Sequence, residues 1–109
     1  MRLDFITIFP RMFDAFLAEG VIARGVKQGQ LDIRVHDLRD FTSDKHRSTD
    51  DEAYGGGPGM VMLGEPVLRA VESIGAGHVV MTSPQGRRFD QRVASELRDQ
   101  QHLVFLCGR

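Results

Sequence analysis

Two runs of consecutive apolar residues in the second half of the chain constrain the fold most. They are HVVMT at 78–82 and HLVFLC at 102–107, and between them lie a turn, SPQGR, and a helical stretch, QRVASELRDQ, with Asp90 at its N-cap position. Continuous apolar strands are typical of parallel sheets, and this order of strand, turn, helix and strand indicates βαβ units. The sequence therefore predicts an α/β fold. In such folds ligands bind beyond the carboxyl ends of the strands, here at 83–86 and 108–109.

The first half of the chain shows the same alternation of strand and helix patterns. RLDFITIF at 2–9 is apolar and β-branched, and Pro10 ends it. LDIRVHDL at 31–38 alternates strictly between apolar and polar residues, which predicts a half-buried strand with His36 facing the surface. We expect a mainly parallel sheet, flanked by helices, with strands near 3–8, 31–36, 78–82 and 103–107.

Three amphipathic stretches predict the helices. The first has large apolar residues at helical spacing and is followed by a second that ends near Gly29. The third is GEPVLRAVESIG, with Pro66 near its start and Gly75 at its end. We expect the apolar residues of the first stretch to belong to the core: Met12, Phe13, Phe16 and Leu17.

The segment 46–60, HRSTDDEAYGGGPGM, is too rich in glycine to form a helix or a central strand, because glycine loses much backbone entropy on ordering and Pro58 has no N–H donor. It predicts a loop that holds a fixed shape and lets a phosphate, a planar base or another chain approach its backbone; the alternative is a flexible hinge. Gly59 is followed by Met60 and Val61, and this spacing excludes both the P-loop and the dinucleotide-binding fingerprint.

Composition narrows the class of protein further. The 14 Lys and Arg residues against 15 Asp and Glu give a net charge of −1, so nucleic acid is not held by a general basic surface and any such contact is local. The single cysteine, Cys107, lies in an apolar run and is expected to pack as a small hydrophobe. Neither a signal peptide nor an apolar run of membrane-spanning length is present, which indicates a cytoplasmic protein without a membrane partner.

The polar stretch from 37 to 52 is a candidate metal site, but its signal is weak. His36 and His46 are ten residues apart and belong to no HExxH or paired-cysteine pattern, so no metal is predicted. We expect a solvated loop with internal ion pairs. The adjacent carboxylates Asp50 and Asp51 are interpreted as groups that order the loop, not as a catalytic base.

Five motifs spread in order over nearly the whole chain carry a family resemblance: IFPRMF, DLRDFT, HRSTDDEAYGGGPGM, SPQGR and the terminal CGR. Together they resemble bacterial tRNA (guanine-N1)-methyltransferases, members of the SPOUT class of knotted methyltransferases, and the run DD-x-x-YGGGPGM is specific. The resemblance implies a homodimer that transfers a methyl group from S-adenosylmethionine to N1 of the guanosine just 3′ of a tRNA anticodon.

The resemblance also implies roles for single residues. Ser83, Pro84 and Gln85 match the first cofactor loop of the family, and Gly108 matches a glycine whose backbone lines the adenosine pocket. These four residues are therefore the expected part of an S-adenosylmethionine site.

Three further residues match positions near the substrate. Pro58 and Gly59 match the loop beside the target base, and Arg109 matches an arginine of the catalytic region. The rest of the knot, the general-base aspartate and the C-terminal tRNA-binding domain of the family lie beyond the residues of this chain. We therefore expect 1–109 to be an incomplete N-terminal methyltransferase domain with a truncated knot, inactive by itself.

Two other interpretations of the sequence remain open. One is a nucleotide-binding or dimerisation module without catalysis, and the other is a SPOUT methyltransferase with a different RNA target. Methyl transfer to N1 of guanine needs a base and donors that stabilise charge on O6, and no residue of this chain is a convincing base.

Overall fold

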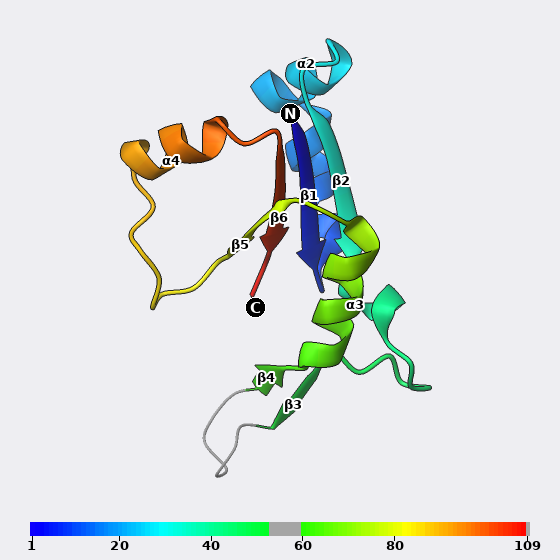
Figure 1. The fold of residues 1–109 in the computed structure, drawn as a ribbon. Coiled ribbons are helices and arrows are strands. Elements are labelled where there is room, and N and C mark those ends of the chain that lie inside the picture. The colour runs from blue at the N-terminus through cyan, green and yellow to red at the C-terminus, as the bar shows by residue number, and fades with distance from the viewer. Residues whose placement is uncertain (53–59, 109) are drawn as a thin grey trace.

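The computed structural model describes residues 1–52 and 60–108, and its largest element is a four-stranded sheet (Figure 1). The strand order is β2–β1–β6–β5, and every neighbouring pair is parallel. The predicted α/β fold with a parallel sheet is confirmed, and each strand lies within one residue of its predicted bounds. The strands are β1 (Arg2–Thr7), β2 (Asp32–Asp37), β5 (His78–Met81) and β6 (His102–Leu106).

One face of the sheet is covered by α3 (Gly64–Ile74), as Figure 1 shows. Ile6 and Val104 from the two central strands are fully buried in one cluster with Ala70 of this helix. Removal of such apolar surface from water is the main term that stabilises the fold. The helix ends at Gly75 as predicted, because φ of +92° there is open to glycine but costly for other residues.

The opposite face carries an aromatic stack. Successive strand residues point to opposite faces, so Phe5 lies on the side away from Ile6. Its ring centroid lies 5.0 Å from that of Phe105, nearly parallel at 11°, and 5.0 Å from that of Phe13, tilted by 44°. Phe13 ends the short helix η1 (Pro10–Phe13), which is followed by α1 (Asp14–Ala18) and α2 (Gly20–Lys27). These elements therefore pack through Phe13 onto this face.

Two of the residues predicted for the core are not buried. Met12 is 76 % exposed and Phe16 is 65 % exposed. The helical spacing identified an apolar stripe correctly, but α1 has only five residues, and the described part of the chain places no element over these two side chains. The prediction that they are core residues is wrong for residues 1–52 and 60–108.

Strand β5 also differs from the prediction. The run HVVMT was expected to be buried on both faces, yet Val79 is 45 % exposed and Met81 is 65 % exposed. The reason is position, because β5 is the edge strand of the sheet and pairs with β6 alone among the described strands. Apolar composition indicated a sheet strand but not its place in the strand order.

The glycine-dense segment is flanked by strands that the sequence did not predict. β3 (Asp50–Glu52) and β4 (Met60–Met62) pair antiparallel in a separate ribbon that extends from one end of the molecule (Figure 1). The prediction of a loop throughout 46–60 is therefore wrong at Asp50–Glu52 and at Met60, whereas 46–49 contain no helix or strand. Residues 53–59 lie outside the described residues. The ribbon is anchored at its base, where the Leu63 N–H donates to the carbonyl of the buried Thr49 at 2.8 Å.

The remaining helices agree with the sequence. α4 (Gln91–Arg98) precedes β6, and the Asp90 carboxylate accepts the Val93 N–H at 3.0 Å, which confirms Asp90 as its N-cap. The helix η2 (Leu38–Phe41) follows β2 and buries Leu38. No helix within the described ranges is long and apolar enough to cross a membrane.

Candidate functional site

The turn after β5 and the end of β6 lie side by side. The Thr82 N–H donates to the Leu106 carbonyl at 3.1 Å, and the Thr82 hydroxyl donates to the same carbonyl at 3.3 Å. That hydroxyl also accepts the Gly108 N–H at 3.2 Å. In the turn, Ser83 Oγ accepts the Gln85 N–H at 3.2 Å, which fixes the loop locally. The structure thus brings Thr82, the first residue of this turn, next to Gly108, at the sheet edge where a ligand was expected.

Gly108 leaves open space beside this turn. A Cβ built on its backbone would have the Thr82 carbonyl oxygen as nearest neighbour at 3.6 Å, an ordinary van der Waals distance. Its φ is also not among the positive glycine angles of the described residues. The described part of the chain therefore does not itself require glycine at this position.

A cavity of about 880 Å³ lies between β5, the turn of 82–86 and α4. Its apolar part includes Val79 and Phe89, and its polar part includes Ser83. An adenosine group needs apolar surface against the base and a few hydrogen-bonding atoms at its edge, and this lining fits those needs. The residues present therefore fit the adenosine part of S-adenosylmethionine, with Ser83, Pro84 and Gly86 as the residues of the turn that would contact it.

A second, more apolar cavity of about 470 Å³ lies on the aromatic side of the sheet end. Gly108 and Cys107 line it together with Phe9, Met12 and Phe16. Burial raises the pKa of the Cys107 thiol, so the thiolate that a nucleophile needs is disfavoured. This agrees with the prediction that Cys107 packs as a small hydrophobe.

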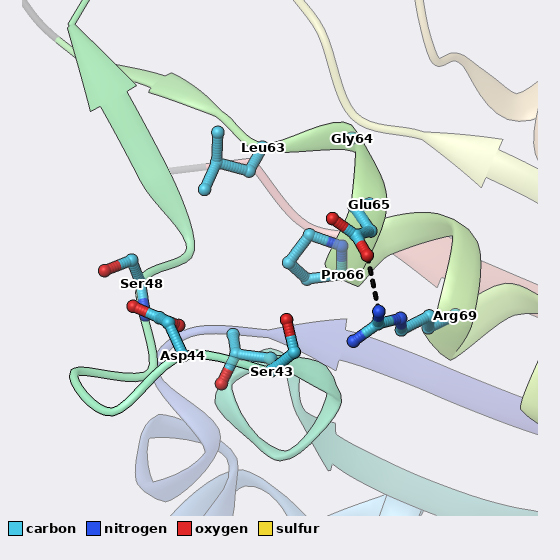
Figure 2. A pocket seen from close by; sticks show the side chains of 9 residues that line it. Ser43, Asp44, Ser48, Leu63, Gly64, Glu65, Pro66 and Arg69 are labelled. Carbon is cyan, nitrogen blue, oxygen red and sulfur yellow. Dashed lines mark hydrogen bonds and ion pairs between the residues drawn. The ribbon is translucent and has the colours of Figure 1, made fainter.

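A polar cavity of about 330 Å³ lies at the foot of the β3–β4 ribbon (Figure 2). Ser43 and Asp44 line it from the segment after η2, and Glu65 and Arg69, which form an ion pair, line it from the first turns of α3. Hydrogen bonds from Ser48 hold the pKa of Asp44 below its ordinary value. The sequence analysis did not find this cavity, because its walls come from two segments that no motif connects.

The polar stretch before the ribbon has the internal ion pairs that the sequence predicted. Arg47 Nη2 lies 2.5 Å from Asp40 Oδ1, and Arg39 Nη1 lies 3.9 Å from Asp37 Oδ1. Both pairs are partly exposed to solvent, so each is expected to contribute little to stability. In the ranges that the structure describes, no group of three or more His, Cys, Asp or Glu side chains is placed to hold a metal ion.

His36 is not the surface residue that the alternation of its strand predicted. Its side chain is 25 % exposed, and Nε2 lies 2.6 Å from Oδ1 of the fully buried Asp4. The prediction failed because a buried carboxylate on β1 offers this imidazole a partner on the covered face of the sheet. An acidic residue inside the apolar run RLDFITIF was the signal that could have revealed it.

Comparison with known proteins identifies the family of this chain. A family model for tRNA (Guanine-1)-methyltransferase matches residues 1–109. The chain belongs to this family. Relatives named tRNA (guanine-N(1)-)-methyltransferase are 48 % identical in Persephonella marina and 46 % identical in Geobacter metallireducens, and both alignments cover 100 % of this chain. The crystal structure of tRNA (m1G37) methyltransferase from Aquifex aeolicus matches the fold over the whole chain, with a TM-score of 0.88 and 33 % identity.

The match covers only part of each of these proteins. The chain spans 44 % and 46 % of the lengths of the two relatives and 51 % of the Aquifex aeolicus chain, which is about half. Family membership in the tRNA (guanine-1)-methyltransferases is thus established for residues 1–109, and so is the SPOUT-type fold of the matched part.

The site residues implied by the family resemblance divide into two groups. Ser83, Pro84, Gln85 and Gly108 are described, and they lie together at the carboxyl ends of β5 and β6. Pro58, Gly59 and Arg109 lie outside the described residues. Within this tRNA (guanine-1)-methyltransferase chain, Ser83 and Pro84 line the cavity beside β5, whereas Gly108 lines the aromatic-side cavity and Gln85 lines neither of the two. The roles of all seven residues stay predictions.

Proposed function

We propose that the protein, at full length, transfers a methyl group from S-adenosylmethionine to N1 of the guanosine 3′ of a tRNA anticodon. The observation that carries this proposal is the match of all 109 residues to the tRNA (Guanine-1)-methyltransferase family. The Aquifex aeolicus protein of similar structure is a tRNA (m1G37) methyltransferase, which supports the position of the target guanosine. The contact of Thr82 with Gly108, which joins the turn after β5 to the end of the neighbouring β6, supports the use of the cofactor.

The chemistry explains what the chain contributes. In the reaction N1 loses its proton and gains the methyl group that S-adenosylmethionine supplies, so N1 must be held in line with the donor and negative charge on O6 must be stabilised. The turn of 82–86 positions the adenosine part through its main chain and the apolar surface beside it. Arg109 is proposed as a donor near the reacting base, and Pro58 and Gly59 as the residues beside that base.

The relatives are about twice as long as this chain, and we propose that the protein has the same length and domain organisation. Residues 1–109 form the N-terminal part of its methyltransferase domain, while the remainder of the knot, the general base and a tRNA-binding domain lie in the part that the relatives have in addition. We further propose that the protein acts on tRNA as a homodimer in the cytoplasm.

Methylation of a tRNA transcript by the full-length protein tests the proposal. We expect S-adenosylmethionine-dependent formation of 1-methylguanosine in a transcript with guanosine 3′ of the anticodon, identified by mass spectrometry of the digested nucleosides. A matched transcript with adenosine at that position should not react. Methylation of both transcripts at another site would favour a different RNA target, and no methylation of any tRNA would rule the proposed function out.

A further inference from the structure

The segment that leads from the turn of 82–86 into α4 carries an excess of positive charge. Its residues 87–98 contain four arginines and two acidic residues, whereas the whole chain has a net charge of −1. This segment lies outside the β5 edge of the sheet, as Figure 1 shows. The positive charge is therefore local to one edge, which is how a chain without a general basic surface can bind a polyanion. The proposed methyl transfer assigns no role to these arginines, which are Arg87, Arg88, Arg92 and Arg98.

Both acidic residues of this segment already have partners in the protein. The Asp90 carboxylate accepts a backbone N–H at 3.0 Å and caps α4. The Glu96 carboxylate pairs with Arg87 at 2.9 Å. Arg88 and Arg92 are exposed, and across residues 1–52 and 60–108 neither forms a hydrogen bond or an ion pair. Their guanidinium groups are therefore free to bind an anion from outside the described chain.

Arg88 and Arg92 line one cavity of about 330 Å³ at the start of α4, which we call the α4 cavity. Its other lining residues are Arg87, Asp90, Val93 and Glu96. Arg87 and Arg88 also line the larger cavity between β5 and α4, whose lining fits the adenosine part of S-adenosylmethionine. The two cavities therefore adjoin each other, and the α4 cavity lies directly beside the proposed cofactor site.

The anion that fits this place is a phosphate of an RNA backbone. A guanidinium is always charged, and its planar fork can donate two parallel hydrogen bonds to one phosphate. RNA carries a phosphate at every nucleotide, so RNA whose target base reaches the methyl donor also brings phosphates to the surface beside the cofactor site. We propose that Arg88 and Arg92 bind backbone phosphates of the RNA substrate at the α4 cavity. This inference rests on the proposed function and adds to it a substrate-binding surface within residues 1–109.

The charges of the α4 cavity limit how much this surface contributes. Three arginines line it together with two carboxylates, so its formal charge is +1 and the carboxylates weaken its field. Arg87 is neutralised by Glu96, which leaves two arginines for two phosphates. Contacts to phosphate fix the position and orientation of a nucleic acid and carry no sequence information. The α4 cavity therefore positions the RNA beside the cofactor and does not select the guanosine.

Equilibrium binding of the full-length protein to a tRNA transcript, measured over a range of salt concentrations, tests the proposal. Arg88→Gln and Arg92→Gln should each raise the dissociation constant for the transcript about fivefold at low salt, because each removes one charged contact. Each should also lower the slope of log affinity against log salt by about 0.7 to 0.9, the counterion release that one phosphate contact causes. A merely structural role of these arginines would leave that slope unchanged.

Two other arginines provide matched controls. Arg98 belongs to the same helix and is 77 % exposed, but it lines neither the α4 cavity nor the cavity beside β5. Arg24 is an exposed arginine of α2 that, like Arg88, has no ion pair among the described residues. Arg98→Gln and Arg24→Gln remove the same charge as the test variants and should keep both the affinity and the salt slope. All four side chains are exposed, so each variant should unfold at the temperature of the unmodified protein.

Methyl transfer by the same preparations separates failure of this inference from failure of the proposed function. If the unmodified protein methylates tRNA while Arg88→Gln and Arg92→Gln keep its affinity and its salt slope, the inference is wrong and the proposed function stands. An equal loss of affinity in the two control variants would show a general effect of net charge, and that result would also overturn the inference. If the unmodified protein neither binds nor methylates tRNA, both the inference and the proposed function fail.

Discussion

Gly108 is the residue at which the requirements of fold and function separate most clearly. Its added Cβ would meet only ordinary contacts in the described chain, so Gly108→Ala should leave the melting temperature of the full-length protein nearly unchanged. If its backbone lines the adenosine pocket, the extra methyl group intrudes there, and we expect the dissociation constant for S-adenosylmethionine to rise about tenfold, since the new contact must displace the ligand or the chain. Calorimetry and thermal unfolding measure the two effects. A loss of stability with unchanged affinity would show that Gly108 serves the fold.

Asp4 should make stability depend on pH at the acid end. Its pKa of about 2 in the folded state lies below the ordinary 3.8, so the stabilisation is present above pH 3.8 and is lost as the pH falls toward 2. Asp4→Asn should destabilise the protein at pH 7 by about 3 kcal/mol, because it leaves Arg2 without its counter-charge and removes the buried carboxylate that His36 and His102 contact. It should also flatten the acid slope.

The matched control for this experiment is Asp32→Asn. Asp32 also pairs with an arginine two residues away, but both side chains are about half exposed, at 55 % and 50 %. Solvent screens such a pair, so little change in stability is expected. Urea unfolding between pH 2 and 7 compares the two variants, and equal effects would show that the burial of Asp4 is not what matters.

At the scale of single elements, α4 depends strongly on its cap, since the helix buries no residue completely. Asp90→Ala removes the acceptor of the Val93 N–H and should cost about 1 kcal/mol. Asp99→Ala, at the other end of α4, removes only a weak contact with Arg98 at 3.9 Å and should be nearly neutral. Guanidinium unfolding of both variants measures the difference. An equal effect of the two substitutions would rule out the cap as the cause.

The sequence predicted where strands lie along the chain better than it predicted which residues contact or cover them. Apolar runs predicted β1, β5 and β6, because strand propensity and hydrophobicity depend on residues that are consecutive in the sequence. The position of β5 at the sheet edge and the exposure of Phe16 depend on contacts between distant segments, which no local pattern contains. The meeting of the turn after β5 with Gly108, through Thr82, followed from a rule about strand ends, whereas the partner of His36 depends on a contact between two strands and was not foreseen.

At the scale of the whole molecule, the described residues form one side of the candidate site. The turn of 82–86 and Gly108 meet at the sheet edge, and the surfaces beside them are apolar and open to solvent at Val79, Met81 and Phe89. Large exposed apolar surface next to convergent polar groups is typical of a surface that binds another molecule or chain segment. A ligand at the proposed cofactor site would therefore be left partly uncovered by the described residues.

Residues 1–109 alone should bind S-adenosylmethionine much more weakly than a complete family member. Binding energy in small-molecule sites comes from enclosing about 70–90 % of the ligand surface. In the described residues, Ser83 and Gly108, which the family resemblance assigns to one site, line two separate cavities. Calorimetric titration of residues 1–109, beside the full-length relative from Persephonella marina under identical conditions, measures the difference, and at least a hundredfold weaker affinity, about 2.7 kcal/mol, is expected. Circular dichroism first establishes that the shorter chain is folded. Comparable affinities would mean that residues 1–109 hold a self-contained site, and the incomplete site proposed here would be wrong.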